Sequence, residues 1–405
     1  MSISVGSNIV RDGLIFGFDM GSKLSWKGRP MTNAFTNPTN LNTSSWSGGN
    51  NFAYDPTTKL LSLTSTSGGS WVLQDTSLTQ SLFYTFSAEV KAASTSYAQI
   101  APSTGFGAST YVNFDISQGQ IVGGTASSYA AIKDIGGGWY RISVTMQADG
   151  NVAGRMTLGP CAYGTTRLAY SGLPIGTGIY VRSCQMEQNN YASQHVDGTR
   201  SNTEAIVDLT GNYTINASNL TYNSDGTFDF NSSNPDYLDL GSDQTIKTSG
   251  GWTVESWVKY DTVPGSYDNV NSPGNFIGSD SITYNSWYWS VLNSKLAMWN
   301  ISPGIWKYGS TTLQNNTWYN AVLVSSDSGT SYQMYLNGVA EGGDHTTYSW
   351  NASYSGLKVR YIGRGNAINT RRVDGKIPIV KIYDRALSAD EVLNNFEALR
   401  GRHGL

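Results

Sequence analysis

Aromatic and amide side chains gather between residues 284 and 308 more densely than elsewhere in the chain. A sugar-binding surface uses these two kinds of residue, because an aromatic face stacks on the apolar side of a pyranose while amide or charged groups fix its hydroxyls. Alternate residues of a strand face opposite sides, so some of these aromatics must instead fill a core. We predict that glycan contacts come from Trp287, Trp306, Tyr308, Asn285 and Asn300.

Carboxylates near this cluster offer a second chemistry, the binding of calcium. Asp261, Asp268 and Asp280 lie in polar stretches, but they form no string of alternating carboxylates around a glycine turn. Six or more oxygens must converge on a calcium ion. The three histidines and two cysteines are scattered and lack metal-ligand spacing. We therefore predict solvated loop carboxylates, no metal site and no other cofactor.

Glu255 is the residue from which an enzyme hypothesis would start. Glycoside hydrolases place two carboxylates about 5 to 9.5 Å apart across a cleft. Alternation puts Glu255 on one face of an expected strand with Thr253 and Trp257, yet no second acid follows at short spacing. No Ser-His-Asp or Cys-His arrangement is evident either. We predict no catalytic residues and no enzymatic activity, with a glycan-degrading enzyme as the weaker alternative.

The composition favours strands and polar turns over helices. Glycine fills 45 of the 405 positions, tyrosine 25 and tryptophan 12, and only 14% of the residues are charged. This predicts an all-β protein with room for two sandwich domains. Cys161 and Cys184 each fall in an expected strand (156–163 and 179–187), which favours buried free thiols over a disulfide.

The charge and hydropathy of the chain bound its partners. A formal net charge of -3 provides no cationic surface for nucleic acid or for an anionic membrane. No window approaches the apolar length that spans a bilayer, and residues 1–7 lack the basic start of a signal peptide. We expect no nucleic-acid or membrane partner, and a chain made and kept in solution.

The stretch from Gly375 to Gly401 combines a strand with the one helix that the sequence predicts. Residues 377–384 alternate as in a strand that is covered on at least one face. Ser388 and Glu391 then have the spacing of a capping box. Apolar residues follow at helical spacing up to Leu399, and Gly401 is expected to close the helix.

This ending resembles that of the concanavalin A-like (laminin-G-like) domains common in virion proteins of tailed bacteriophages. The resemblance rests on residues 383–388, on the strand 318–322 and on the hairpin 335–338 with its Asn-Gly turn. It extends to an opening strand at 12–19, whose usual continuation is found far downstream at 207–212. The gap implies an inserted domain, and residues 9–19 should then pair with strands of the C-terminal half.

The inserted part resembles the jelly-roll, carbohydrate-binding-module-like domains of phage tail and capsid proteins. The matching residues are 86–91, 114–116, 136–141 and 185–187. Strands are expected over 60–64, 84–91, 111–116, 139–146 and 179–186. The run from Tyr84 to Lys91 is echoed from Trp252 to Lys259, and Trp139-Tyr140 is echoed by Trp318-Tyr319, which suggests two sandwiches of similar plan.

The expected architecture is therefore all-β, with two β-sandwich (jelly-roll) domains and a short C-terminal helix. Residues 1–29 and 199–400 would form a discontinuous concanavalin A-like sandwich, and residues 30–198 the inserted jelly-roll domain. A sandwich of this kind implies a lectin-like protein, although fold alone does not carry function.

The resemblance implies a non-enzymatic protein of the phage virion surface, made in the host cytoplasm, that aids attachment to host-surface glycans as a capsid decoration, head fibre or tail fibre. Its partners would be other capsid or tail proteins, in a homo-oligomer or many-copy array. A purely structural decoration protein without glycan binding is the alternative. A secreted bacterial lectin-like module is disfavoured by the missing signal peptide.

Overall fold

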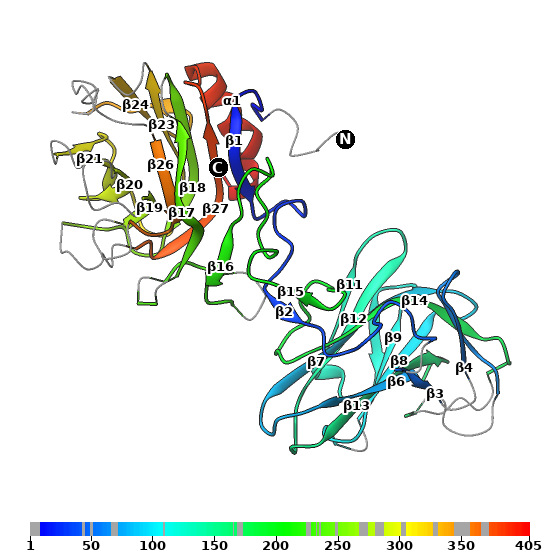
Figure 1. The fold of residues 1–405 in the computed structure, drawn as a ribbon. Helices are drawn as coiled ribbons and strands as arrows, with labels where there is room; N and C mark the ends of the chain where they lie inside the picture. Colours follow the sequence, from blue (N-terminus) through cyan, green and yellow to red (C-terminus); the bar gives the residue numbers. More distant parts are fainter. Residues whose placement is uncertain are drawn as a thin grey trace. The chain divides into compact units, whose positions relative to one another are not determined.

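A computed structural model gives the fold of the chain (Figure 1). It describes residues 9–42, 45–48, 52–65, 72–107, 110–164, 166–167, 173–223, 228–231, 233–234, 236–247, 250–266, 274–279, 287–300, 305–326, 331–343, 357–365 and 372–405. The chain divides into two compact units, one of Met1–Pro30 with Ser201–Leu405 and the other of Met31–Arg200. Nearly all regular structure in both is antiparallel sheet, which confirms the predicted fold class.

The discontinuous unit is a sandwich of a six-stranded and a seven-stranded sheet. Its core is built from side chains of both sheets, among them Phe16, Phe18, Val254 and Trp289. The first sheet has the order β1 (Leu14–Asp19), β27 (Gly375–Tyr383), β18 (Trp252–Tyr260), β23 (Trp318–Ser326), β24 (Ser331–Leu336) and β25 (Val339–Ala340). The second has the order β16 (Asn216–Asn219), β17 (Tyr237–Lys247), β26 (Leu357–Ile362), β19 (Gly274–Gly278), β20 (Trp287–Leu292), β21 (Lys295–Asn300) and β22 (Ile305–Tyr308).

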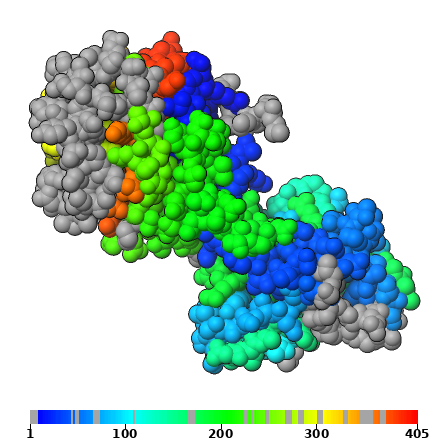
Figure 2. Space-filling model, viewed as in Figure 1, coloured from blue at the N-terminus to red at the C-terminus, as the bar shows by residue number. Residues whose placement is uncertain are grey.

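The two distant parts of this unit meet along β1 and β27. Phe16 pairs with Ile382 and Phe18 with Val380 in an antiparallel register. The N-terminal and C-terminal segments therefore lie side by side, as the blue and red atoms show in Figure 2. The pairing predicted for residues 9–19 is observed. A bulge between Leu14 and Phe16 turns Leu14 away from the core between the sheets, into a smaller cluster with Tyr383 and Val392.

The outer face of the six-stranded sheet is covered by helix α1 (Ala389–Leu399; Figure 1). Ser388 caps this helix and Glu391 completes the predicted capping box. Trp257 and Ile379 pack against Phe396 of the helix. The expectation that Gly401 ends the helix is wrong.

A 3-10 turn, Arg400–His403, continues the chain through Gly401, and the left-handed residue is Gly404, with φ 73°. The turn persists because His403 stacks on the buried ring of Trp257, with ring centroids 4.3 Å apart. This tertiary contact overrides the local signal of Gly401.

Local turn chemistry behaves as the sequence predicts. Asn337 and Gly338 both have positive φ, 51° and 77°, as a tight hairpin turn between β24 and β25 requires.

The sequence motif that occurs once in each unit has a structural counterpart as well. Lys259 pairs with Trp318 across β18 and β23.

In the inserted unit, Lys91 pairs in the same way with Trp139. In both units, therefore, a lysine near the end of one strand pairs with the tryptophan that begins the neighbouring strand. The sequence similarity thus corresponds to one shared pairing scheme.

The inserted unit has two six-stranded sheets with a core between them. The first has the order β10 (Gln120–Gly123), β9 (Val112–Asp115), β8 (Tyr97–Pro102), β13 (Ala153–Cys161), β6 (Val72–Ser77) and β3 (Ser47–Gly48). The second has the order β11 (Ala130–Asp134), β12 (Trp139–Gln147), β7 (Phe83–Ala92), β14 (Gly178–Glu187), β5 (Leu60–Leu63) and β4 (Phe52–Asp55). A short pair, β2 (Met31–Thr32) with β15 (Thr199–Arg200), lies where the chain enters and leaves this unit. Cys161 and Cys184 are buried and free, as predicted.

Candidate functional site

Trp287 is part of the core of the discontinuous unit, so its assignment as a glycan contact is wrong. The side chain is 1% exposed, and its indole nitrogen donates a 2.8 Å hydrogen bond to the carbonyl of Lys358. Its ring packs beside that of Trp252. Alternation along β20 explains the outcome, because Trp287 and Trp289 point toward the opposite sheet. A ring enclosed in this way offers no open face to a sugar.

Trp306 and Tyr308 lie on β22, the edge strand of the seven-stranded sheet, and both are half-buried. Trp306 pairs across the strands with Trp299 of β21, and the two indole centroids are 5.1 Å apart with the rings tilted by 40°. Trp306 of the predicted cluster is therefore partly exposed at the edge of the sheet, together with its neighbour Trp299. Asn285, and the side chain of Asn300, lie outside the described residues.

The carboxylates considered for calcium and for catalysis have separate locations. Asp261 is exposed after β18, whereas Asp268 and Asp280 lie outside the described residues. Glu255 is completely buried and forms an ion pair with Lys381, with 3.1 Å between Oε1 and Nζ. Within the described ranges, no three His, Cys, Asp or Glu side chains come together as metal ligands would.

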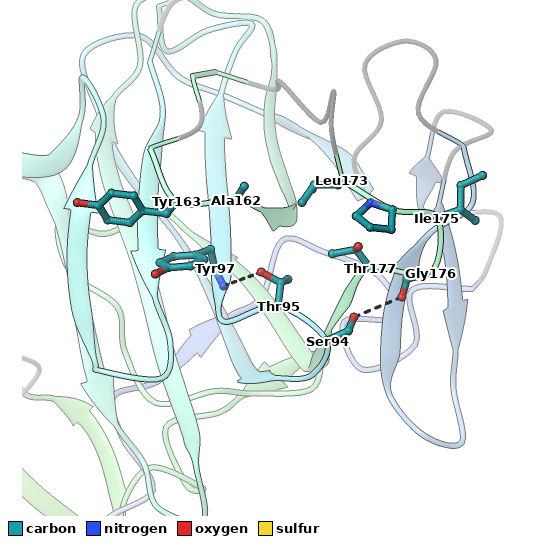
Figure 3. A pocket seen from close by; sticks show the side chains of 10 residues that line it. Ser94, Thr95, Tyr97, Ala162, Tyr163, Leu173, Ile175, Gly176 and Thr177 are labelled. Carbon is teal, nitrogen blue, oxygen red and sulfur yellow. Dashed lines mark hydrogen bonds between the residues drawn. The ribbon is translucent and has the colours of Figure 1, made fainter.

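A hollow of about 560 Å³ opens on the inserted unit, where the ends of several strands meet (Figure 3). Its lining comes from the turn between β7 and β8, from the residues after β13 and from the residues before β14. Two tyrosines stand at one side and Ile175 at the other (Figure 3). The lining residues are Ser94, Thr95, Tyr97, Ala162, Tyr163, Leu173, Pro174, Ile175, Gly176 and Thr177.

The two tyrosines give the hollow an aromatic wall. Tyr163 is 72% exposed, and its ring meets that of Tyr97 edge to face with centroids 5.7 Å apart. Burial and the nearby carboxylate of Asp115 raise the pKa of Tyr97. Its phenol is therefore neutral at neutral pH, and its one proton is directed at the Asp115 carboxylate. Ile175, 67% exposed, adds an apolar surface across the hollow.

Two hydroxyl groups hold the walls of the hollow together. Ser94 Oγ accepts a 2.8 Å hydrogen bond from the amide of Gly178 and donates to the carbonyl of Gly176. Thr95 Oγ1 donates to the carbonyl of Cys161 at 3.0 Å and accepts from the amide of Tyr97. Each hydroxyl links segments that are far apart in sequence, so the aromatic wall has a fixed base.

Sequence reasoning did not single out Tyr97 or Tyr163. Both are isolated tyrosines in a chain rich in tyrosine, so neither stands out by composition. The antiparallel pairing of β8 with β13 places Tyr97 opposite Cys161, and the chain turns out to Tyr163 just beyond. Tyr163 ends an expected strand (156–163), but no expected strand included Tyr97, so the sequence held no signal that joined the two. Among the described residues no helix is long and apolar enough to cross a membrane.

Comparison with known families supports the fold of the discontinuous unit. Residues 231–393 match the concanavalin A-like lectin/glucanases superfamily. This region runs from before β17 into α1, so it includes most strands of both sheets. The resemblance seen in the sequence is thereby confirmed for a concanavalin A-like lectin/glucanase domain. No curated protein has a significant sequence match to the chain.

Several solved structures are similar to parts of the chain. Domain 4 of an extracellular GH43 arabinanase from Geobacillus stearothermophilus, in complex with arabinotriose, is 18% identical over 48% of this chain and 92% of its own, with a TM-score of 0.34. The CBM40 of the Ruminococcus gnavus IT-sialidase, bound to alpha2,3 sialyllactose, is 12% identical over 36% and 82%, with a TM-score of 0.29. At these TM-scores the similarities carry no argument about function.

Proposed function

We propose that this chain is a non-enzymatic carbohydrate-binding protein of a phage virion surface that aids attachment to host-surface glycans. One observation carries the binding part of the proposal, namely the exposed ring of Tyr163 beside Tyr97 in the hollow of the inserted unit. The lectin-like fold of residues 231–393 agrees with it. Fold alone would not suffice, because one fold serves many functions.

The chemistry of the hollow suits a sugar ring. A pyranose has an apolar face, which stacks on an aromatic ring, and hydroxyls that need donors and acceptors. Tyr163 supplies the open ring face, and the Tyr97 phenol oxygen, whose proton is directed at Asp115, supplies an acceptor. The segment 173–177 lines the opposite side. The Trp299–Trp306 pair at the edge of the other unit is a second place where a ring could stack.

The surroundings of Glu255 support a role without catalysis. Its Oε1 contacts Lys381 Nζ and accepts a hydrogen bond from Asn320, and its Oε2 accepts a 2.8 Å hydrogen bond from Asn395. A general acid or nucleophile needs access to the glycosidic bond. Glu255 is instead enclosed between the sheet and helix α1.

A glycan array followed by calorimetry tests the binding proposal. Replacement Tyr163→Ala should weaken binding up to about tenfold, since an aromatic stacking contact is worth about 0.5–1.5 kcal/mol. Tyr129→Ala is the matched control, because Tyr129 is also exposed but lies outside the hollow. Equal loss of affinity in both variants would refute the hollow as the binding site, and no glycan bound at all would leave a purely structural decoration protein.

The virion role is supported by the phrases at 12–19, 318–322 and 383–388 that resemble phage virion domains. We propose other capsid or tail proteins as partners, and a homo-oligomer or many-copy array as the working form. Weak sites gain from this arrangement, because linked copies raise avidity by about 10²- to 10⁴-fold. Light scattering measures the oligomer, and electron microscopy of particles measures copy number and location. A strict monomer present as one isolated copy per particle would contradict the proposal.

A further inference from the structure

The lining of the hollow divides into an aromatic, a hydroxyl-bearing and an apolar part (Figure 3). Tyr97 and Tyr163 form the aromatic part. The apolar part comes mainly from the segment before β14, so a ligand that fills the hollow meets both aromatic rings and aliphatic side chains. The volume of about 560 Å³ is typical of small-molecule sites. The hydroxyl-bearing residues are Ser94, Thr95 and Thr177, and the apolar residues are Ala162, Leu173, Pro174 and Ile175.

The apolar part of the hollow lies open to water. Pro174 and Ile175 are exposed and Leu173 is half-buried, and none of the three belongs to the core of the inserted unit. A ligand with an apolar group at this place would remove their surface from water, which is favourable. A hydroxyl in the same place would lie against aliphatic carbon and lose its hydration without a partner. This part of the hollow therefore favours a methyl group over a hydroxyl.

The hydroxyl groups at the base of the hollow already use their protons. Ser94 Oγ and Thr95 Oγ1 each donate to a backbone carbonyl. The proton of the Tyr97 phenol is directed at Asp115. These three side chains have no donor left for a ligand, although their oxygens can still accept. The base therefore suits a ligand hydroxyl that donates, and it does not suit a carbonyl that needs a donor, such as that of an N-acetyl group.

Thr177 is the exception among these hydroxyls. The residue is 8% exposed, and its Oγ1 has no hydrogen-bond partner among the described residues. Its backbone is fixed on both sides, because its amide donates to the carbonyl of Pro174 and its carbonyl accepts from the amide of Leu63. A hydroxyl held in the wall of the hollow in this way can bind one hydroxyl of a ligand, as donor or as acceptor.

The described lining of the hollow carries no charged side chain. All ten residues are neutral, and the adjoining charge is that of Asp115, which pairs with Tyr97 across β8 and β9. The Asp115 carboxylate accepts hydrogen bonds from Ser117 and Gln118. A carboxylate beside the aromatic wall repels an acidic sugar, and no cation of the lining offsets this repulsion. The hollow therefore favours an uncharged sugar.

We propose that the hollow selects 6-deoxyhexoses such as rhamnose or fucose, which carry a methyl group, over hexoses that carry a hydroxyl on the same carbon. Tyr163 stacks on the sugar ring, Leu173 and Ile175 contact the methyl group, and Thr177 binds one ring hydroxyl. The inference rests on the proposed carbohydrate-binding function and names the ligand class of the same site.

Calorimetry on the full chain compares pairs of sugars that differ in a single oxygen atom. The pairs are methyl α-L-rhamnoside with methyl α-L-mannoside, and methyl α-L-fucoside with methyl α-L-galactoside. In the pair that binds, the 6-deoxy sugar should bind about tenfold more tightly. This is the lower end of the range of about 10- to 200-fold by which apolar pockets discriminate one small group, as expected for an open hollow.

Substitutions in the apolar part should act on this preference alone. Leu173→Ser and Ile175→Ser should each bring the two affinities of a pair closer together, mainly by weakening the 6-deoxy sugar. Tyr163→Ala should weaken both sugars alike and keep the preference. Val152→Ser is the matched control and should change neither, because Val152 is an exposed aliphatic residue of the same unit outside the hollow.

The hydroxyl of Thr177 has a test of its own. Thr177→Val removes one hydrogen bond to the ligand and should weaken both sugars of a pair about fivefold. Thr177→Ser keeps the hydroxyl and should keep the affinity. Equal affinities of the valine variant and the unmodified chain would exclude Thr177 from the site.

The outcomes separate this inference from the proposed function. If both sugars of a pair bind equally well and Tyr163→Ala weakens both, the selection is refuted and the proposed function stands. A preference that survives in both Leu173→Ser and Ile175→Ser overturns the assignment of the methyl group. Tighter binding of N-acetylglucosamine or of glucuronate than of either 6-deoxy sugar overturns the ligand class. If no sugar binds at all, both proposals fail.

Discussion

Lys381 Nζ lies 3.1 Å from Glu255 Oε1, and both side chains are enclosed on the helix-covered face of the six-stranded sheet. The two residues are also direct neighbours across β18 and β27. Asn395 of helix α1 donates to Glu255 Oε2 and to the phenol oxygen of Tyr383. Its Oδ1 in turn accepts from the amide of Val10. One polar network therefore connects the first residues of the unit, its central strands and its last helix.

Removing the cation of this pair should destabilise the discontinuous unit severely. Lys381→Met leaves the Glu255 carboxylate buried without its counter-charge, and we expect a loss of about 3–5 kcal/mol in the free energy of unfolding. Arg155→Met is the matched control, because the pair of Arg155 with Asp75 is about 40% exposed. That change should cost about 0–1 kcal/mol. Equal losses in urea denaturation would contradict the buried pairing.

The capping box of α1 should be measurable by substitution. Ser388 Oγ accepts from the amide of Glu391, and Glu391 accepts from the amide of Ser388. Ser388→Ala removes the first bond and should cost about 0.5–2 kcal/mol. Ser388→Asp preserves an acceptor at the cap and should restore most of the loss. Urea denaturation of the three proteins decides, and similar stability of the alanine and aspartate variants would refute the cap.

Acid should weaken the C-terminal helix through Glu391. Hydrogen bonds from Arg385 and from the cap hold the pKa of Glu391 to about 2, below its usual value of 4.5. Because the folded-state pKa is the lower one, its contribution to stability is complete above about pH 4.5 and is lost as the pH falls toward 2. Glu391→Gln should flatten this part of the stability profile. An unchanged acid limb in the variant would assign the pH dependence to other carboxylates.

Trp287 and Trp306, the two tryptophans of the predicted glycan-binding cluster, should respond differently to replacement by alanine. Trp287→Ala removes a core side chain and should cost about 3–5 kcal/mol. Trp306→Ala, on the edge strand, should cost much less because its ring is already partly hydrated. Thermal unfolding compares them directly. Comparable losses would mean that the edge indole is packed as tightly as the buried one.

The thiols of Cys161 and Cys184 should both be unreactive in the native protein. Burial raises the pKa of Cys161 to about 12 and raises that of Cys184 well above its usual value, so neither forms the reactive thiolate at neutral pH. A thiol reagent such as dithiobis(nitrobenzoate) should label no cysteine in buffer and both in guanidinium. Fast labelling of the native chain would show that one strand end opens readily.

The sequence by itself determined features that depend on a few neighbouring residues. The capping box needs only Ser388 and Glu391, and the hairpin turn needs only Asn337 and Gly338. Alternation likewise grouped Thr253, Glu255 and Trp257 on one face of β18. Such signals are local because the groups that satisfy one another lie within one turn of helix or one hairpin. The split family phrases added the pairing of β1 with β27.

Only the tertiary structure decided which face of each strand meets a partner. Alternation separates Trp287 from Tyr288 but does not say which side faces the opposite sheet, and this choice buried Trp287 while leaving Trp306 at an edge. Helix α1 and Lys381 enclose Glu255 through contacts between segments distant in sequence. Tyr97 and Tyr163 meet for the same reason, because the pairing of β8 with β13 brings their strand ends together. Sites of this kind depend on contacts between segments that are distant in sequence. A short stretch of sequence contains only one of the two partners of each contact, so it cannot reveal the site.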